Sequence, residues 1–277
     1  MDTVRLNINL MQLIGLRRAE LRNGDEQPQY VLELSRMYRR LGCGLLLSEK
    51  DAGGFFSCLY RAADLYLQFL ERHSGGAGLD PYYMARGRAE PLLDALAIGD
   101  VALARRIDAL AATTYREGME YEEDFWFFSL LPKLASAGAD EREALEGLEV
   151  LDGLDQMEQA LQGISYPRYD ILLALAREDA RGFERALKDL TGAWMAERKR
   201  EAGSGLGNPY AGPEAGVFVE GVALVRVARV RGLRIREKYR LIPAAALSSP
   251  RQAFRRQPLW KRAAHSNPRT HPRQSSR

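Results

Sequence analysis

The sequence predicts an all-α protein: one domain of about ten packed helices arranged as helical hairpins, with a disordered basic C-terminal tail. Three observations support this fold class. Apolar residues recur every three or four positions along most of the chain. Short breaks rich in Gly, Asp and Pro separate these periodic segments. No stretch alternates with a period of two for long, since the β-like patches at 217–219 and 225–227 both fall within helical spacing. We therefore expect few or no strands.

The periodic segments define the expected helices in order. They cover residues 4–22, 29–47, 55–73, 81–98, 101–115, 119–136, 140–162, 167–177, 179–199 and 213–232. Asp80 and Pro81 supply a cap and a first-turn proline for the fourth helix, and Asp100 is a good N-cap for the fifth. Two of the junctions have similar sequences, because residues 95–106 and 174–185 both have the pattern of a helix, a short acidic turn and a second helix. This similarity indicates stacked hairpins and lacks the fixed period of a repeat array.

The segment 140–162 is the clearest amphipathic helix. Its expected apolar stripe consists of Leu145, Leu148, Leu151, Leu154, Met157 and Leu161. An acidic row runs beside the stripe at steps of three residues: Glu146, Glu149, Asp152, Asp155 and Glu158. Because a step of three falls short of a full helical turn, the row winds slowly round the helix and forms an acidic ribbon.

The chain changes character near residue 250. Residues 250–277 are rich in Arg, Pro, Ser and Gln, with few apolar anchors. Such a composition does not bury enough surface to offset the entropy of ordering. We expect a helical domain over 1–249 and a disordered basic tail over 250–277.

Charge is unevenly distributed along the chain, although the net charge is only +3. Between residues 117 and 158 there are 13 Asp or Glu and 2 Lys or Arg; from residue 226 onward there are 15 Lys or Arg and 1 Glu. Fields of one sign bear on partners and association rates rather than on fold. The acidic region indicates a cationic partner.

Residue types that enzymes require are scarce. The three histidines occupy a helix end and the tail, and no C-x-x-C, H-E-x-x-H or P-loop pattern is present. We expect no catalytic residues, no metal and no cofactor. Cys43 and Cys58 sit among small and apolar residues and are expected to be buried free thiols.

A second acidic group lies next to four aromatic residues. Glu120, Glu122, Glu123 and Asp124 are followed directly by Phe125, Trp126, Phe127 and Phe128. Four rings cannot all face the core from one helical turn, so part of this set, with Trp126 as the candidate, is expected at the surface beside the acids. We expect the partner to bind these four acids, Trp126 and the acidic row of 140–162.

The final ordered stretch carries a family resemblance. Residues 221–233 read GVALVRVARVRGL and residues 239–243 read YRLIP, after a helical pair that begins at Tyr169. This ending is similar to that of the bacterial polymorphic-toxin immunity family forty-nine, over residues 80–247. The resemblance implies an all-helical, non-enzymatic protein that binds and neutralises one cognate secreted toxin in interbacterial competition. No membrane-spanning run and no signal peptide are evident, so we expect a cytoplasmic location.

Two other functions remain open. A helical-repeat protein–protein adaptor has the same composition, and a regular concave groove would favour it. A nucleic-acid-binding protein would use the Arg-rich residues 226–240 and the tail, but few aromatic residues are interleaved there, and we expect no nucleic acid on the folded domain.

Overall fold

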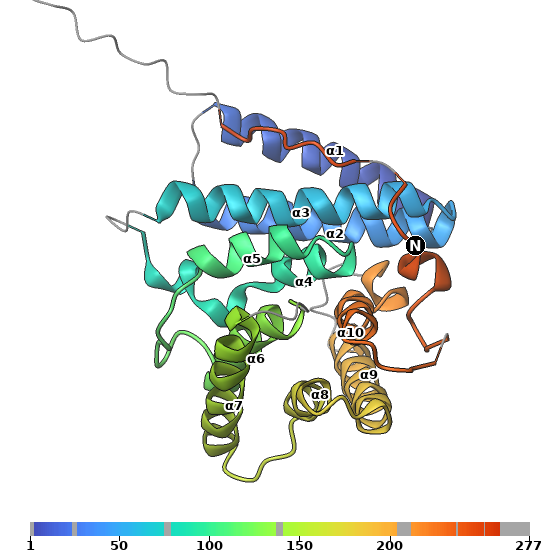
Figure 1. Cartoon of the computed structure of the whole chain (residues 1–277). Helices are drawn as coiled ribbons and strands as arrows, with labels where there is room; N and C mark the ends of the chain where they lie inside the picture. Colours follow the sequence, from blue (N-terminus) through green and yellow to red (C-terminus); the bar gives the residue numbers. More distant parts are fainter. Residues whose placement is uncertain are drawn as a thin grey trace, which may run out of the picture.

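The computed structural model describes residues 3–23, 27–74, 79–136, 141–203, 212–236, 238–251 and 253–260, with the backbone alone for 141–146 and 202–203. Within these residues the helices are α1 (Thr3–Arg22), α2 (Pro28–Ser48), α3 (Ala52–His73), α4 (Glu90–Ala97), α5 (Val101–Leu110), α6 (Glu122–Leu134), α7 (Glu141–Leu161), α8 (Pro167–Ala176), α9 (Ala180–Gly203) and α10 (Val219–Val230) (Figure 1). Short 3₁₀ turns are η1 (Pro81–Met84), η2 (Arg86–Arg88), η4 (Glu214–Gly216) and η5 (Ala244–Leu247). The described part of the chain contains no strand, only an isolated bridge between Tyr239 and Ile242, so the all-α prediction is confirmed there.

Local chemistry sets where several helices begin. The Asp51 carboxylate accepts the Gly54 N–H at 2.8 Å and caps α3. Asp100 caps α5 by accepting the Leu103 N–H at 2.9 Å, as the sequence predicted. Asp179 does the same for α9 through Gly182, also at 2.9 Å. These contacts satisfy N–H groups that have no partner inside the helix. The sequence similarity between residues 95–106 and 174–185 therefore corresponds to two junctions in which a helix, a turn and a capped second helix follow one another.

The helices pack as hairpins, with α2 against α3, α4 against α5, α6 against α7 and α8 against α9. Helix α3 lies at the centre, because Phe55, Tyr66 and Phe69 are fully buried and the helix contacts α2, α4 and α5. Helix α10 packs on α4 and is buried along most of its length. In Figure 1 the α2–α3 hairpin runs across the view and α6–α7 runs down it, so these two hairpins are not aligned with each other. This arrangement lacks the regular stacking that a helical-repeat adaptor would need.

Four expected helices are clearly shorter than their periodicity suggested, among them α6, which covers Glu122–Leu134 and not 119–136. The segment 81–98 starts as η1 and η2 and becomes α-helical only at Glu90. Pro91 lies in the first turn of α4, where the missing N–H costs nothing, so the proline marks the start of this helix. Likewise α5 ends at Leu110, and residues 213–232 begin as η4 before α10.

The tail prediction is corrected for residues 253–260, here called the strap. The strap runs along α1 and α3 as the orange trace in Figure 1. Phe254 stacks on Tyr60 with centroids 4.8 Å apart, Leu259 is buried, and the Arg72 guanidinium lies 4.8 Å from the centre of the Trp260 ring. The few apolar side chains of the strap are therefore packed against the helices, because side chains on α3 offer surfaces that fit them. Residues 261–277 lie outside the described residues.

Cys43 and Cys58 are free and buried, as predicted. None of the helices in the described ranges combines the length and apolarity that crossing a membrane requires.

Candidate functional site

Helix α7 carries a mixed apolar and acidic surface. Its buried residues are Val150, Leu154, Met157 and Leu161, which pack against the core. Leu148 and Leu151 are instead 66% and 58% exposed, so the apolar stripe predicted from the sequence is wrong at these two positions. The reason is the spacing: leucines three residues apart rotate about 60° further round a helix at each step, so only part of the row can face the core.

The acidic row lies on the same exposed side. Glu149, Asp152, Asp155 and Glu158 are all exposed. Glu149 forms an ion pair with Lys133 of α6 at 2.5 Å, whereas Asp152 and Asp155 have no ion pair with any described residue. The side chain of Glu146 lies outside the described residues. We define the α7 face as Leu148, Glu149, Leu151, Asp152, Asp155 and Glu158.

The position of α7 is fixed by a close approach to α6. A Cβ on Gly153 would lie 2.5 Å from a methyl carbon of Leu130, which is itself buried. The glycine therefore lets the two helices come together at this point. This contact, with Leu154 and Met157 beside it, presents the α7 face outward on a packed support.

In the second predicted acidic group, which consists of Glu120, Glu122, Glu123 and Asp124, two carboxylates are engaged within the protein. Glu120 accepts the Gly87 N–H at 2.5 Å and lies 3.3 Å from the Arg116 backbone nitrogen. Asp124 accepts hydrogen bonds from the Tyr166 hydroxyl and the Arg168 guanidinium, both at 2.5 Å. These two carboxylates hold η2 and the start of α8 against α6. Glu122 and Glu123 lie half-buried in the first turn of α6, where a negative charge suits the helix dipole.

The four aromatic residues of α6 divide as the sequence suggested. Phe125, Phe127 and Phe128 are buried, while Trp126 is partly exposed. The Trp126 ring packs edge-on against Phe125 with centroids 5.2 Å apart, and its N–H lies 3.5 Å from Glu122. Trp126 is thus the member of this set that a partner can reach.

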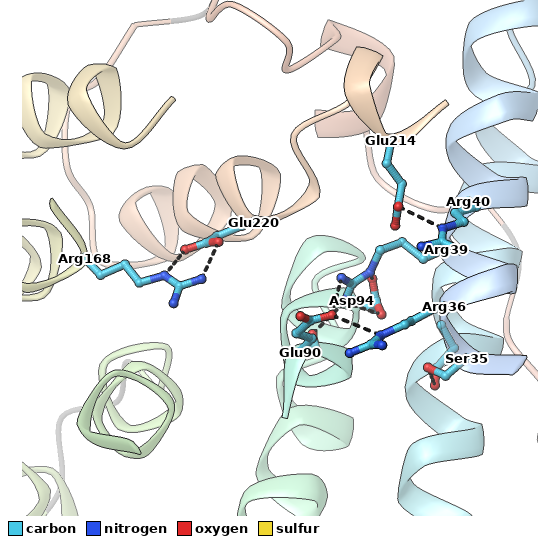
Figure 2. A network of polar contacts seen from close by, with 10 residues as sticks. Ser35, Arg36, Arg39, Arg40, Glu90, Asp94, Arg168, Glu214 and Glu220 are labelled. Atoms are coloured by element: carbon cyan, nitrogen blue, oxygen red, sulfur yellow. Dashed lines mark hydrogen bonds and ion pairs between the residues drawn. The ribbon is translucent and has the colours of Figure 1, made fainter. Parts of the chain in front are cut away.

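Sequence reasoning missed a charged cavity of about 410 Å³ between α2, α4, α8, α9 and α10. Figure 2 shows its polar network. Arg39 binds Asp94 through two hydrogen bonds of 2.7 and 2.9 Å, and Arg40 binds Glu214 at 3.0 Å. Arg168 binds both carboxylate oxygens of Glu220 at 2.7 and 2.9 Å. The partners are 52 to 174 residues apart in the sequence, so no local pattern could have revealed them.

The electrostatics of this cavity favour a structural role. Burial raises the pKa of Asp94 to about 6, although the Arg39 guanidinium opposes that effect. Burial also acts on Glu90, but Arg39 and Arg36 outweigh it and hold the pKa of Glu90 below its usual value. A general base needs a free lone pair directed at a substrate, whereas Asp94, Glu214 and Glu220 each have an arginine against the carboxylate. We interpret the network as an ionic connection between helices. Among the described residues, no three His, Cys, Asp or Glu side chains are grouped as metal ligands would be.

A profile of the family described as immunity protein 49 matches residues 32–246. This match starts within α2 and ends within η5, so it extends the resemblance seen at residues 80–247 back by most of the α2–α3 hairpin. It includes the α7 face and the charged cavity, and it leaves out α1 and the strap. No curated protein and no solved structure matches the chain.

Proposed function

The chain belongs to the immunity protein 49 family, and on this premise we propose that it binds one cognate protein toxin stoichiometrically and thereby neutralises it. The family is generally non-enzymatic, and we propose that this chain likewise acts by occupying the toxin rather than by catalysis. Its place of action would be the cytoplasm of the producing cell or its siblings, where an incoming toxin would act.

The α7 face is the observation that carries this proposal. Leu148 and Leu151 are large apolar side chains left in solvent on a helix whose other side is well packed. Apolar residues rimmed by charges are typical of protein interaction sites. Asp152 and Asp155 lie next to them without an ionic partner in the described structure, so their charge is available to another molecule.

The chemistry of this surface indicates the kind of toxin. Carboxylates attract a cationic cleft and raise the association rate, while the two leucines contribute area that is buried on contact. Toxins that cut or modify nucleic acids need a basic cleft for their substrate. We propose that the α7 face covers such a cleft. Glu120 and Asp124 are excluded from the proposed interface because their carboxylates are engaged inside the protein.

The test uses a candidate toxin domain, sought by sequencing the reading frames next to the gene for this chain, then co-expressed and purified. Asp152→Lys with Asp155→Lys should lower the association rate by about tenfold or more at low salt, and the effect should shrink as salt is added. Leu151→Asp should mainly raise the dissociation rate. Both variants should lose protection of growing cells while their melting temperatures stay close to that of the unaltered protein.

Glu49→Lys is the matched control, because Glu49 is exposed at the end of α2, away from α7. It should leave protection and association intact. If the α7 variants protect as well as Glu49→Lys does, the α7 face is only a solvated surface and the proposed site is rejected. If the unaltered protein neither binds nor protects against this toxin domain, the proposed function is rejected.

A further inference from the structure

A basic groove of about 710 Å³ lies between α9 and the segment that follows α10. Its cationic lining residues are Arg181, Arg185, Lys188, Arg236, Lys238 and Arg240. The apolar part of its lining is formed by Leu187, Met195 and Tyr239. A volume of this size is within the range of pockets that hold small ligands.

Most of this positive charge is not neutralised within the protein. Glu184 is the one acid that lines the groove among the described residues, and it is engaged by Arg236, whose Nε lies 2.9 Å and whose backbone N lies 2.8 Å from the carboxylate. The other five cations make no ion pair with any described residue. Asp179 at the start of α9 lies near Arg181 and Arg185, but its carboxylate accepts the N–H groups of Arg181 and Gly182.

The charges are arranged in two rows. Arg181, Arg185 and Lys188 follow one face of α9, at steps of about 4.5 to 6 Å along the helix axis. Arg236, Lys238 and Arg240 occupy alternate positions of the facing segment and all line the same groove. The groove is therefore suited to a ligand with several closely spaced anionic groups.

A contact of Glu184 links the two sides of the groove. Glu184 fixes Arg236 and lies 3.5 Å from the Tyr239 hydroxyl, so it ties the facing segment to α9. Burial, followed by the charge of Glu184, raises the pKa of Tyr239 to about 12. The partly buried Tyr239 ring lines the groove and offers a flat apolar surface.

We propose that the basic groove binds the phosphate groups of a nucleotide, with the guanidinium groups on the phosphates and the base against Tyr239. Four of the six cations are arginines, whose planar fork matches a phosphate better than a lysine does. The same chemistry is offered by a free nucleoside triphosphate and by single-stranded nucleic acid. This site is separate from the α7 face, and its occupancy does not depend on the proposed function.

The experiment measures binding of two probes, ATP and a fluorescent ten-nucleotide single strand, to the full chain in about 0.1 M salt. Lys188→Glu should weaken binding about tenfold, and the slope of log affinity against log salt should fall by roughly 0.7 for the strand, as expected for one lost phosphate contact. Lys199→Glu is the matched control, because Lys199 is exposed on the same helix outside the groove and the change in net charge is identical. Melting temperature checks that both variants are folded.

Each outcome decides the proposal. If Lys188→Glu weakens ATP binding and Lys199→Glu does not, the ligand is a free nucleotide. If only binding of the ten-nucleotide single strand shows this pattern, the ligand is single-stranded nucleic acid. Equal weakening by both variants means that general positive charge, including the basic tail, is responsible, and it overturns the proposal. Failure of both probes to bind overturns it as well, and so does a stronger affinity for a poly-glutamate peptide, which would reassign the groove to an acidic protein segment.

Discussion

Gln68 of α3 accepts the main-chain N–H of Leu259 at 2.8 Å, and its side-chain amide donates to the Gln257 carbonyl at 3.0 Å. The same amide nitrogen also lies 2.9 Å from Asp64, so this buried side chain is fully satisfied. One glutamine thus recognises the strap backbone on both sides of Pro258 and directs the Leu259 side chain into the protein. This contact joins residues 191 positions apart, one of them outside the family match.

Removing the strap should destabilise the fold. A chain ending at Ser249 loses the buried Leu259 and the ring stack of Phe254 on Tyr60. Burial of one leucine is worth about 1.5–3 kcal/mol, which for a chain of this size lowers the melting temperature by about 3 °C or more. A chain ending at Trp260 keeps every described contact of the strap and serves as the control. Equal melting temperatures for the two truncations, measured by circular dichroism, would show that the strap contributes nothing.

The Glu71–Arg256 pair should make part of this stabilisation dependent on pH. Hydrogen bonds from Arg256 lower the pKa of Glu71, and Arg106 adds to the effect at 2.7 Å. A carboxyl whose pKa is lower in the folded state stabilises that state above its unfolded pKa and loses this contribution as pH falls. The Tm of the unaltered protein should therefore exceed that of Glu71→Gln at pH 7, and the difference should start to shrink below about pH 4.5 and vanish once the pH is below the lowered pKa of Glu71.

The control for this prediction is Glu49→Gln, which changes an exposed carboxylate without an ion pair in the described structure. Its Tm difference should stay near zero across the same range. Asp64 also lies near Arg256, and burial raises its pKa, which gives the opposite pH trend. Burial, the largest cause of that shift, is the same in both proteins compared, whereas the smaller part due to the charge of Glu71 is lost in Glu71→Gln. A Glu71→Gln difference that persists unchanged at about pH 3 contradicts the assignment.

The buried pair of Arg39 and Asp94 should show strong coupling. Asp94 has 1% of its side chain exposed, and Arg39 has 13%. Asp94→Ala leaves a buried guanidinium with only its contacts to Glu90, and it should cost about 3 kcal/mol of unfolding free energy. Arg39→Met should cost a similar amount. The double variant Arg39→Met with Asp94→Leu should recover most of the loss, because apolar residues often replace a buried ion pair without penalty. Urea unfolding measures all three, and additive losses would contradict the coupling.

Two glycines of α7 should respond in opposite ways to alanine. At Gly147 an added Cβ would meet no atom within 4 Å, so Gly147→Ala should stabilise the helix by about 0.5–1 kcal/mol. At Gly153 the added Cβ would lie 2.5 Å from Leu130, so Gly153→Ala should lose that gain and destabilise by about 1–3 kcal/mol. The two variants change the same residue type on the same helix and act as controls for each other. Similar effects on unfolding free energy would mean that α6 and α7 do not approach closely.

Much of the fold was predictable because helix formation depends on residues a few positions apart. The caps at Asp100 and Asp80, the first-turn prolines and the 3.6-residue periodicity all act within one or two turns. The errors occurred where a local pattern was ambiguous. In α7 the leucines and acids both recur every three residues, and this spacing alone does not tell which ones face the core.

The candidate surface was predicted only in part. The acidic row was correctly expected on the outside at Glu149, Asp152, Asp155 and Glu158. Glu120 and Asp124 also lie in an acidic stretch of the sequence, yet their carboxylates accept hydrogen bonds from groups of the same protein. Their partners, Gly87 and Arg168, lie 33 and 44 residues away. A charge count does not distinguish a solvated carboxylate from one engaged in packing.

Helicity, the start of many helices and the acidic character of region 117–158 follow from the sequence alone, because these properties depend on neighbouring residues or on composition. Packing determines which leucines of α7 are exposed, that Arg39 contacts Asp94, that the strap lies on Gln68, and that cations from α9 and from Arg236, Lys238 and Arg240 form one groove. These relationships join distant segments. They arise only when the helices pack, since packing and not local propensity sets which side chains are brought within contact distance.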